Sequence, residues 1–380
     1  MTSSADHNLP ARPNGVLVMG ECLVDLAPAA VPLQHLNLGQ PASGTPGEER
    51  YLLALPGGSP ANVAVGLARL GAQAYFAGRL SVFGFGPWLR QHLERNHVDL
   101  RFSIEAPEPP TLAVVTLDSQ GKATYSFYGP ETADWQWAES ELPIDGPGTA
   151  NRGRAASAPE LGLAAVHAGS LMTAYQPAAS VLAKWLRALR AAGDVLISFD
   201  PNVRPALVDD RPTYCALVEN MISCAHIVKA SSEDIEAMYG GSTGGMAPPS
   251  SEIIVPARPR DMQDAAHRWL SLGASLVVIT EGANGATAFH RRGWQLRATP
   301  PQVVVKDTIG AGDSFTSGLL SYLADAQVLG PGDVAELSEE HLRRALSRAV
   351  AASALTCTRA GSDPPTKEEL DQFLSQGTGA

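Results

Sequence analysis

Short apolar runs alternate along the chain with segments in which apolar residues recur every three or four positions. The apolar runs predict buried strands at residues 16–26, 74–78, 166–170, 195–199, 226–229 and 276–280. Helical spacing marks the segments 61–70, 87–93, 178–191, 231–236 and 341–355, the last of which we expect to be the final helix. Strands that alternate with helices usually pair in parallel. The pattern therefore predicts an α/β fold with a mostly parallel central sheet.

A second pattern, strict alternation of apolar and polar residues, occupies residues 111–117 and 122–128. These segments flank the polar stretch 118–121, and together they predict a β-hairpin. An earlier segment rich in proline, glycine and polar residues ends in a short apolar run. We expect both regions, residues 27–56 and 108–132, to form a small β-lid beside the main sheet.

Residues 306–315 contain a glycine-rich turn. It follows a β-branched run at 303–305, which predicts a strand, and precedes a segment whose apolar spacing predicts a helix. Gly310 and Gly312 permit backbone conformations in which successive N–H groups converge on one point. The start of a helix adds unpaired N–H groups and the positive end of the helix dipole. The turn therefore predicts a site for an anion, and phosphate is the best candidate.

Asp313 is unexpected in such a turn, because its carboxylate opposes a bound phosphate. One explanation is catalysis, in which Asp313 takes a proton from a hydroxyl group that attacks the phosphorus atom. The other is that Asp313 caps the following helix. The spacing by itself leaves both open.

Two other polar residues stand where ligands often bind. Asp25 follows the first apolar run, and ligands of open α/β sheets collect at the carboxyl ends of strands. It is equally consistent with a solvated loop acid. Gly57 and Gly58 open a helix with Asn62 in its first turn, where the amide either faces a ligand or caps the helix.

Composition narrows the function classes. The 380 residues suffice for one large α/β domain or two smaller ones, and 44% of them are hydrophobic. The net charge of −11 argues against a nucleic-acid or membrane-surface partner. The four cysteines have no paired or metal-ligand spacing, which favours reduced thiols in the cytoplasm. Residues 1–14 are expected to be a flexible tail, without a signal peptide.

Two motifs resemble those of a known family. The segment Asp307 to Asp313 is similar to the C-terminal signature of the ribokinase-like (PfkB) sugar kinases, and the segment Gly57 to Ala64 is similar to their N-terminal signature. The resemblance implies that residues 15–380 form one kinase domain, a three-layer α/β/α sandwich with a β-lid. The chain departs from the family at residues 80–86, where an acidic segment is replaced by apolar residues.

The resemblance also implies roles for individual residues. Asp313 would be the catalytic base, and the N–H groups of Gly310, Ala311 and Gly312 would stabilise the phosphoryl charge. Asp25, Gly57, Gly58 and Asn62 would bind the sugar. Lys229, Ser231, Thr280, Gly282, Gly285, Gly310 and Gly312 would bind ATP; without the resemblance, the segment around Gly282 predicts only a tight turn.

Two metal sites follow from the same resemblance. Family members hold Mg²⁺ through water at a glutamate for which this chain has Asp234, with Glu233 beside it. The alternative is that both acids only complement the helix dipole. A monovalent cation, with K⁺ as the candidate, would bind mainly backbone oxygens of Asp307, Ile309, Thr356, Arg359 and Gly361.

The resemblance indicates the reaction class and leaves several candidates for the sugar substrate. The segment 200–205 resembles an element shared by fructokinases and ketodeoxygluconate kinases, in which Arg204 binds an anionic group or braces its loop. Fructose is the first choice, 2-keto-3-deoxygluconate the second, and ribose or a nucleoside the third. A protein that binds sugar or nucleotide without catalysis is the alternative from another class. We also expect a homodimer formed through the β-lid.

Overall fold

The computed structural model describes residues 12–28, 51–117, 123–144, 157–208, 210–240, 259 and 261–377. Most of the predicted N-terminal tail and of the first lid segment lies outside the described residues, as does the predicted hairpin turn. In the described part of the chain, no helix is both long and apolar enough to cross a bilayer. None of the four cysteines, all of which lie in described segments, forms a disulfide. The cytoplasmic location stays a prediction.

Within the described residues, eight strands form the central sheet, in the order β14-β13-β12-β11-β10-β9-β1-β4. Six strands run parallel: β4 (Ala74–Ala77), β1 (Gly15–Met19), β9 (Leu163–Gly169), β10 (Leu196–Asp200), β11 (Ile227–Ser231) and β12 (Leu276–Thr280). At one edge, β13 (Ala286–His290) and β14 (Gln295–Ala298) continue the sheet antiparallel. The predicted mostly parallel sheet is confirmed.

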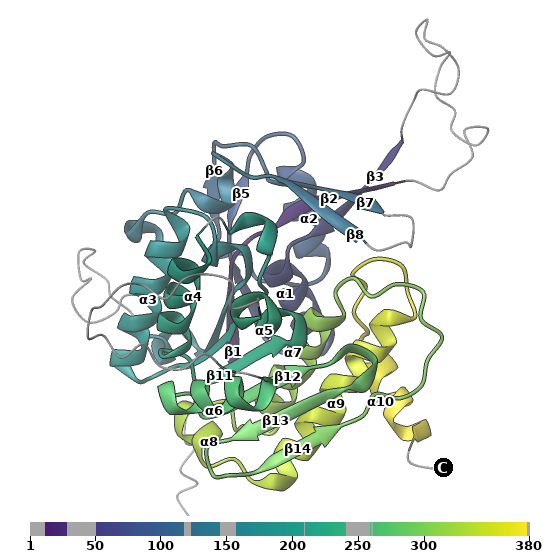
Figure 1. The fold of residues 1–380 in the computed structure, drawn as a ribbon. Helices are drawn as coiled ribbons and strands as arrows, with labels where there is room; N and C mark the ends of the chain where they lie inside the picture. Colours follow the sequence, from purple (N-terminus) through teal and green to yellow (C-terminus); the bar gives the residue numbers. More distant parts are fainter. Residues whose placement is uncertain are drawn as a thin grey trace, which may run out of the picture.

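The two faces of this sheet carry separate apolar cores, because successive side chains of a strand point to opposite faces. In β1, Leu17 and Met19 join one core, while Val16 and Val18 join the other. The first core contains residues of α3 (Ala178–Ala192), α4 (Arg211–Ile222), α5 (Ser232–Tyr239) and α6 (Met262–Leu272). The second contains residues of α1 (Ser59–Arg69), α2 (Gly86–Arg95), α7 (Ala311–Asp325), α8 (Pro331–Ala335) and α9 (Glu339–Cys357). The predicted three-layer sandwich is therefore confirmed (Figure 1).

A smaller sheet lies beside the central sheet (Figure 1). Its strands are β3 (Leu52–Gly57), β2 (Leu23–Pro28), β7 (Leu112–Leu117) and β8 (Ala123–Tyr128), paired in that order. The sheet begins at Leu23, earlier than the expected lid boundary at residue 27. The residues just before β2 and β7 are hydrogen-bonded to the same buried acid. Asp134 accepts from the backbone N–H groups of Cys22 (2.9 Å) and Thr111 (3.4 Å).

The first apolar run was expected to be one strand and is two. The chain leaves the central sheet after β1 at Gly20, where a Cβ atom would lie 2.2 Å from Cγ of Pro60. After this turn, β2 begins in the smaller sheet. Apolar periodicity did not reveal the break, because both strands are largely apolar. Asp25 therefore lies within a lid strand and not at the end of a central strand.

Two further expectations were wrong. Residues 303–305 are not a strand, and the side chains of Val304 and Val305 are 83% and 59% exposed. Their β-branched side chains favour a strand only where packing supports it. The helix over 341–355 is not the final one, since α10 (Lys367–Gly377) follows and packs against α9 through Leu370.

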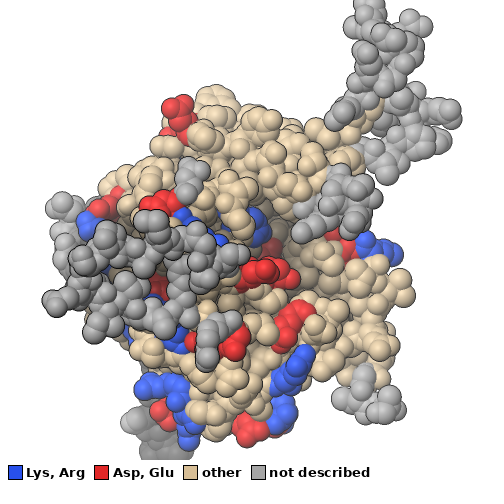
Figure 2. Space-filling view, viewed as in Figure 1, with Lys and Arg blue, Asp and Glu red and all other residues tan. Residues whose placement is uncertain are grey.

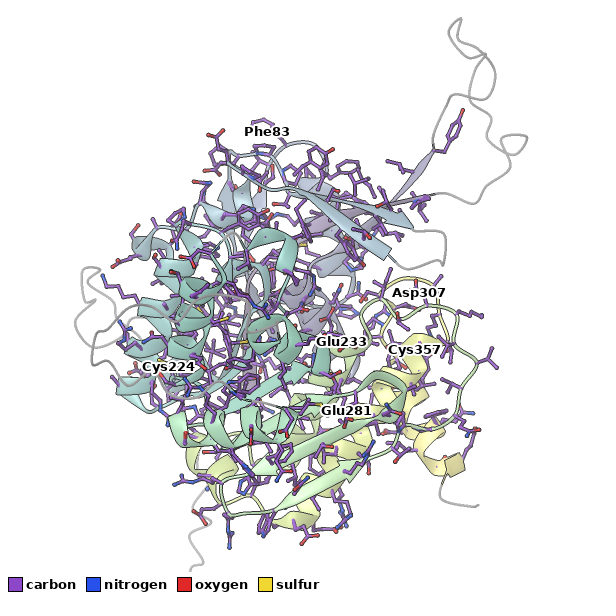
Figure 3. The ribbon with its side chains drawn as sticks, in the orientation of Figure 1. Phe83, Cys224, Glu233, Glu281, Asp307 and Cys357 are labelled. Atoms are coloured by element: carbon purple, nitrogen blue, oxygen red, sulfur yellow. The ribbon has the colours of Figure 1, made fainter. Side chains whose placement is uncertain are left out.

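The short parallel strands β5 (Arg79–Ser81) and β6 (Ile104–Ala106) were not predicted, because three residues are too few to show a period. Strand β5 overlaps the start of the region, residues 80–86, in which the chain departs from the family motif. The departing loop is on the surface, with Phe83 60% exposed and at the upper rim of the molecule (Figure 3).

Candidate active site

A cavity of about 770 Å³ lies between the smaller sheet and the carboxyl ends of the central strands. Figure 2 shows a hollow in the middle of this face, with acidic side chains at its edge. The cavity brings together ten of the residues singled out in the sequence: Asp25, Gly58, Asn62, Arg204, Lys229, Asp307, Ile309, Gly310, Gly312 and Asp313. These residues come from five separate regions of the chain, and the fold collects them around one space.

Asp313 lies in the first turn of α7, whose N-cap is Gly310 with φ 74°. Only glycine adopts this left-handed conformation without strain. The carboxylate of Asp313 is bound by α1: Ser59 Oγ donates to Oδ1 (2.6 Å) and Asn62 Nδ2 donates to Oδ2 (2.8 Å). The interpretation of Asp313 as a simple helix cap is therefore disfavoured. Asn62 lines the cavity and holds this acid in place, and its expected contact with the sugar stays a prediction.

The surroundings of Asp313 make it a stronger base than a free aspartate. Burial raises the pKa of its carboxyl group, and the hydrogen bonds from Ser59 and Asn62, together with the charge of Lys229, offset part of that rise. A carboxylate with a raised pKa holds a proton more firmly, which suits a general base.

Lys229 provides a fixed positive charge next to the glycine turn. Its ammonium group forms a buried ion pair with Asp200, with Nζ 2.8 Å from Oδ2. Burial lowers the pKa of Lys229, but the charges of Asp200 and Asp234 outweigh it, so the net direction is upward. A Cβ atom on Gly312 would lie 3.0 Å from Nζ, so glycine at this position leaves space for the cation. An acidic protein thus has a local positive charge where a phosphate would approach.

The glycine pair before α1, Gly57 and Gly58, leaves space for Asp25 and for the backbone of Glu21. A Cβ atom on Gly57 would lie 2.2 Å from Oδ2 of Asp25, and one on Gly58 would lie 2.6 Å from the carbonyl oxygen of Glu21. Gly58 also has φ 100°, which side chains disfavour. Burial raises the pKa of Asp25 to about 6; nearby Asp313 adds to the rise and Arg204 opposes it.

Arg204 lines the cavity and also braces its own loop. Its Nη1 donates to Oδ1 of Asn202 (2.7 Å), to the carbonyl oxygen of Asn202 (3.2 Å) and to that of Val203 (3.3 Å). Both predicted roles of Arg204 are therefore compatible with its position.

Four residues expected to bind ATP lie at or just after the ends of two adjacent strands of the central sheet, β11 and β12. Ser231 of β11 pairs with Thr280 of β12 in the sheet register. The turn after β12 is tight at Gly285, where a Cβ atom would lie 2.1 Å from the carbonyl oxygen of Ala298. Ser231, Thr280, Gly282 and Gly285 are outside the lining of the cavity. Their role in binding ATP stays a prediction.

The two acids expected near magnesium differ in their surroundings. Asp234 is buried, and its carboxylate accepts from Val203 N (2.7 Å) and from both N (2.7 Å) and Oγ (2.8 Å) of Ser231. It thereby caps α5. Glu233 is exposed and labelled in Figure 3. Among the described residues, no three acidic, histidine or cysteine side chains are grouped so that they could hold a metal ion.

Asp307 joins the glycine turn to the chain that follows α9. Its Oδ1 accepts from Ile309 N (3.0 Å) and its Oδ2 from Gly361 N (2.8 Å). Lys306 N also donates to the carbonyl oxygen of Cys357 (2.8 Å), and Figure 3 shows Asp307 and Cys357 as neighbours. Thr356 is buried and its side chain bonds to Ser314, while Arg359 pairs with Glu369. The segments expected around a monovalent cation are thus held together.

Sequence reasoning missed several cavity residues: Glu21, Ser59, Tyr125, Phe127, Ser170 and Asn202. Glu21 is 1% exposed and accepts from Ser170 Oγ (2.6 Å). Burial raises its pKa to about 8. The sequence signal for Glu21 is an acid directly after a glycine within an apolar run. That run predicts a single strand, with Glu21 in its interior.

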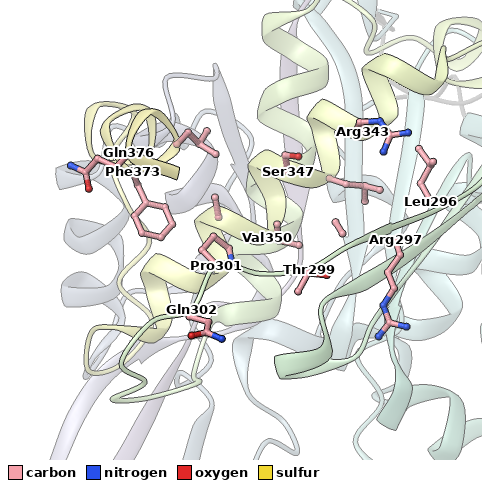
Figure 4. Close-up of a pocket in the computed structure, with 14 residues that line it drawn as sticks. Leu296, Arg297, Thr299, Pro301, Gln302, Arg343, Ser347, Val350, Phe373 and Gln376 are labelled. Carbon is pink, nitrogen blue, oxygen red and sulfur yellow. The ribbon is translucent and has the colours of Figure 1, made fainter. Parts of the chain in front are cut away.

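A second pocket, of about 650 Å³, lies between β14, α9 and α10 (Figure 4). Its described lining is largely apolar, includes Val350 and Phe373, and carries the cations Arg297 and Arg343 but no carboxylate. It therefore offers no general base. Gln302 is also part of the lining, and the chain continues from this residue to the glycine turn at Gly310.

Comparison with known proteins agrees with this geometry. The family model for pfkB family carbohydrate kinases matches residues 14–369. The chain is 31% identical over 330 residues to a fructokinase from Rhizobium leguminosarum bv. trifolii, covering 86% of this chain and 85% of that protein. A crystal structure of a fructokinase with bound ATP from Xylella fastidiosa superimposes with a TM-score of 0.77 at 25% identity, covering 96% and 99% of the two chains. A fructokinase from Vibrio cholerae O395 in fructose, ADP and calcium ion bound form gives a TM-score of 0.72 at 25% identity, covering 95% and 99%.

Proposed function

Because the chain belongs to the pfkB family of carbohydrate kinases, we propose that it transfers the γ-phosphate of ATP to a hydroxyl group of fructose. The family makes the chain a carbohydrate kinase, and the identity of the sugar is the proposed part. Relatives named fructokinase support fructose. The observation that carries the reaction is the carboxylate of Asp313, held by Ser59 and Asn62 at the start of α7 inside the cavity.

In the proposed reaction, Asp313 accepts the proton of the sugar hydroxyl group while the hydroxyl oxygen bonds to the γ-phosphorus. The bond between that phosphorus and the bridging oxygen breaks, and ADP leaves. The raised pKa of Asp313 supports this role, since a stronger base takes the proton more readily. Ser59 and Asn62 keep both carboxylate oxygens oriented.

Charge on the transferring group would be stabilised from two sides. The N–H groups of Gly310, Gly312 and Asp313 are at the start of α7, where the helix dipole is positive. The N–H group of Ala311, which was expected to act with them, donates to the carbonyl oxygen of Thr308 (3.2 Å). Lys229 adds an ammonium group whose position is fixed by Asp200. Such preorganised groups are the main way in which proteins accelerate phosphoryl transfer.

Magnesium supplies charge neutralisation on the triphosphate when it is bound with ATP. Mg²⁺ usually keeps several waters and binds through one or two carboxylates together with phosphate oxygens. Glu233 would contact its water, since it is exposed and Asp234 uses both oxygens within the fold. Oxygens around Asp307 and Gly361 would suit a potassium ion, whose requirement is tested by replacing K⁺ with Na⁺ in the assay.

The adenine base would lie in the pocket of Figure 4. Its largely apolar walls suit a flat base. This pocket lies at the other end of the segment that leads into the glycine turn. The assignment places base and triphosphate on one continuous stretch of chain.

A neutral sugar fits the charges of the cavity better than a sugar acid. Asp25 and Asp313 both line the cavity, and the pKa of each is raised by burial and by neighbouring negative charge. A carboxylate on the substrate would add to this repulsion. Arg204 would oppose it, but one of its terminal nitrogens is already bonded to the loop.

A second copy of the chain would cover the outer strands of the lid. Leu52 and Leu53 of β3 are 47% and 52% exposed, and Tyr128 of β8 is 63% exposed. Both strands are edges of the smaller sheet, and exposed apolar edge strands readily pair with another chain. Sedimentation velocity measures whether the protein is dimeric.

The test of function is ATP consumption with a panel of sugars. We expect turnover that depends on fructose and exceeds turnover with 2-keto-3-deoxygluconate, ribose or nucleosides. Faster turnover with the sugar acid would contradict the choice of fructose. Binding of sugar and ATP without any turnover would instead identify a regulatory protein.

A further inference from the structure

Glu21 is the least expected residue of the cavity. It lies in the turn between β1 and β2, where the chain passes from the central sheet to the lid. Its side chain is 1% exposed and lines the cavity. Ser170 Oγ donates to its Oε1 (2.6 Å), while its Oε2 has no hydrogen-bond partner among the described residues. A buried polar atom without a partner is costly, so a function is the expected compensation.

The two residues behind Glu21 have strained backbones. Ser170 has φ 55° and Asn202 has φ 41°, in the left-handed region that non-glycine residues rarely adopt. They follow β9 and β10, which are neighbours in the sheet with Gly169 paired to Asp200. Strain of this kind persists where the surroundings enforce it and is concentrated at ligand sites.

Hydrogen bonds through these residues all point toward Glu21. Arg204 Nη1 donates to Asn202 Oδ1 (2.7 Å), Asn202 Nδ2 donates to Ser170 Oγ (3.1 Å), and Ser170 Oγ donates to Glu21 Oε1. Ser170 has one hydroxyl proton, which this bond uses. The chain of donors thus ends at Oε1 and leaves Oε2 for another partner.

The charge state of Glu21 determines what that partner is. Burial raises its pKa to about 8; the bond from Ser170 and the charge of Arg204 oppose the rise, and the charge of Asp134 adds to it. The raised pKa favours the protonated, uncharged form of the carboxyl group. With Oε1 accepting from Ser170, the proton is available on Oε2, where it can be donated to a neutral oxygen.

We propose that Glu21, positioned by Ser170 and Asn202, forms a sugar subsite that donates a hydrogen bond from Oε2 to one hydroxyl group of the substrate. This subsite is separate from Asp25 and rests on the proposed function. A neutral polyhydroxy compound is the class of ligand it accepts. It selects among sugars by the presence and orientation of one hydroxyl group, because an analogue without that group leaves Oε2 unpaired.

The experiment compares Glu21→Leu and Glu21→Gln with the wild type. Steady-state kinetics are measured with ATP, with the sugar that the wild type prefers, and with a set of its monodeoxy analogues. The wild type should discriminate against several analogues. Glu21→Leu should raise the sugar KM roughly tenfold, leave the ATP KM unchanged, and lose discrimination against one analogue only. Glu21→Gln keeps a donor of similar size and should retain that discrimination.

Ser170→Ala tests the positioning role, with Ser198→Ala as its matched control. Both serines are buried and bond to side chains nearby, Ser170 to Glu21 and Asn202. Ser198 bonds to His167 (3.0 Å) and does not line the cavity. Ser170→Ala should weaken the same single discrimination as Glu21→Leu. Ser198→Ala should lower Tm without changing any sugar KM. Circular dichroism and Tm identify any variant that fails to fold, in which case Glu21→Gln and Ser170→Ala decide the question.

The outcomes separate the subsite from the proposed function. A wild type that binds no sugar would overturn both. Normal wild-type turnover, with folded Glu21→Leu showing an unchanged sugar KM, would overturn the subsite alone. Equal loss of affinity for the sugar and all its analogues would also overturn it, because a general structural effect has no preference for one hydroxyl group.

Discussion

Asn62 donates a hydrogen bond from Nδ2 to Oδ2 of Asp313, 2.8 Å away in space and 251 residues away in sequence. The contact joins the first glycine-rich motif to the second. The two motifs act together, because the first supplies the side chains, Ser59 and Asn62, that orient the carboxylate of Asp313 in the second. The amide of Asn62 thus has a partner within the protein before any sugar binds.

Replacing Asp313 with asparagine should lower kcat by at least ~10²-fold, because general-base catalysis contributes about 10²- to 10⁴-fold. The side chain keeps its size, but the amide cannot accept the hydroxyl proton. ATP affinity, measured by calorimetry, should change little. A variant with near-normal kcat would show that the proton leaves by another route.

Asn62→Ala should lower kcat and shift its pH profile. The hydrogen bond from Asn62 lowers the pKa of Asp313, so its removal raises that pKa further. The base must be ionised to act, and the acid limb of the kcat profile should therefore move to higher pH. A lower kcat with an unmoved profile would mean that Asn62 contributes only to folding or sugar binding.

Asp25→Asn should raise the sugar KM roughly 10- to 100-fold, the value of a hydrogen bond to a charged group. Its pKa of about 6 adds a second signature. In the wild type the carboxylate becomes protonated as the pH falls through about 6, so the sugar KM should rise there. In the variant this rise should disappear. Equal changes in the KM values of sugar and ATP would assign Asp25 to the fold.

Arg204→Met distinguishes the two leading sugars. If fructose is the substrate, the loss of the bonds to Asn202 and Val203 should lower kcat or Tm without selectively weakening sugar binding. If the substrate is a sugar acid, its affinity should fall by roughly 1.5–3 kcal/mol, the value of a charged hydrogen bond. Calorimetry with both compounds, for wild type and variant, measures this. Tight binding of the acid that is lost in the variant would overturn fructose.

The central fold could be predicted from the sequence because its strands are buried on both faces and its helices have one apolar side. Periodicity carries that information locally. The split between β1 and β2 could not be predicted in this way, since it depends on Pro60 packing against Gly20. The strand predicted at Val304 and Val305 is absent from the fold for a similar reason: a β-branched run forms a strand only when another strand pairs with it.

The site shows the same division. Asp313 and the glycine turn were found because their spacing is local and unusual. The partner of Asn62 and the burial of Glu21 were not found, because both depend on segments that meet only in the folded chain. Local spacing identified the chemical groups, and the tertiary structure determined which of them work together.

The attachment of the lid has a consequence for how the reaction is timed. Asp134 accepts hydrogen bonds from backbone N–H groups at the entry points of both β2 and β7. Asp25 belongs to β2, whereas Asp313 is hydrogen-bonded to α1 at the start of α7. The acid proposed to bind the sugar and the acid proposed to remove its proton therefore come from the smaller sheet and from the main body of the protein. We expect that any displacement of the smaller sheet would separate the two acids, so that loss of the phosphoryl group to water is less favourable than its transfer to a bound sugar.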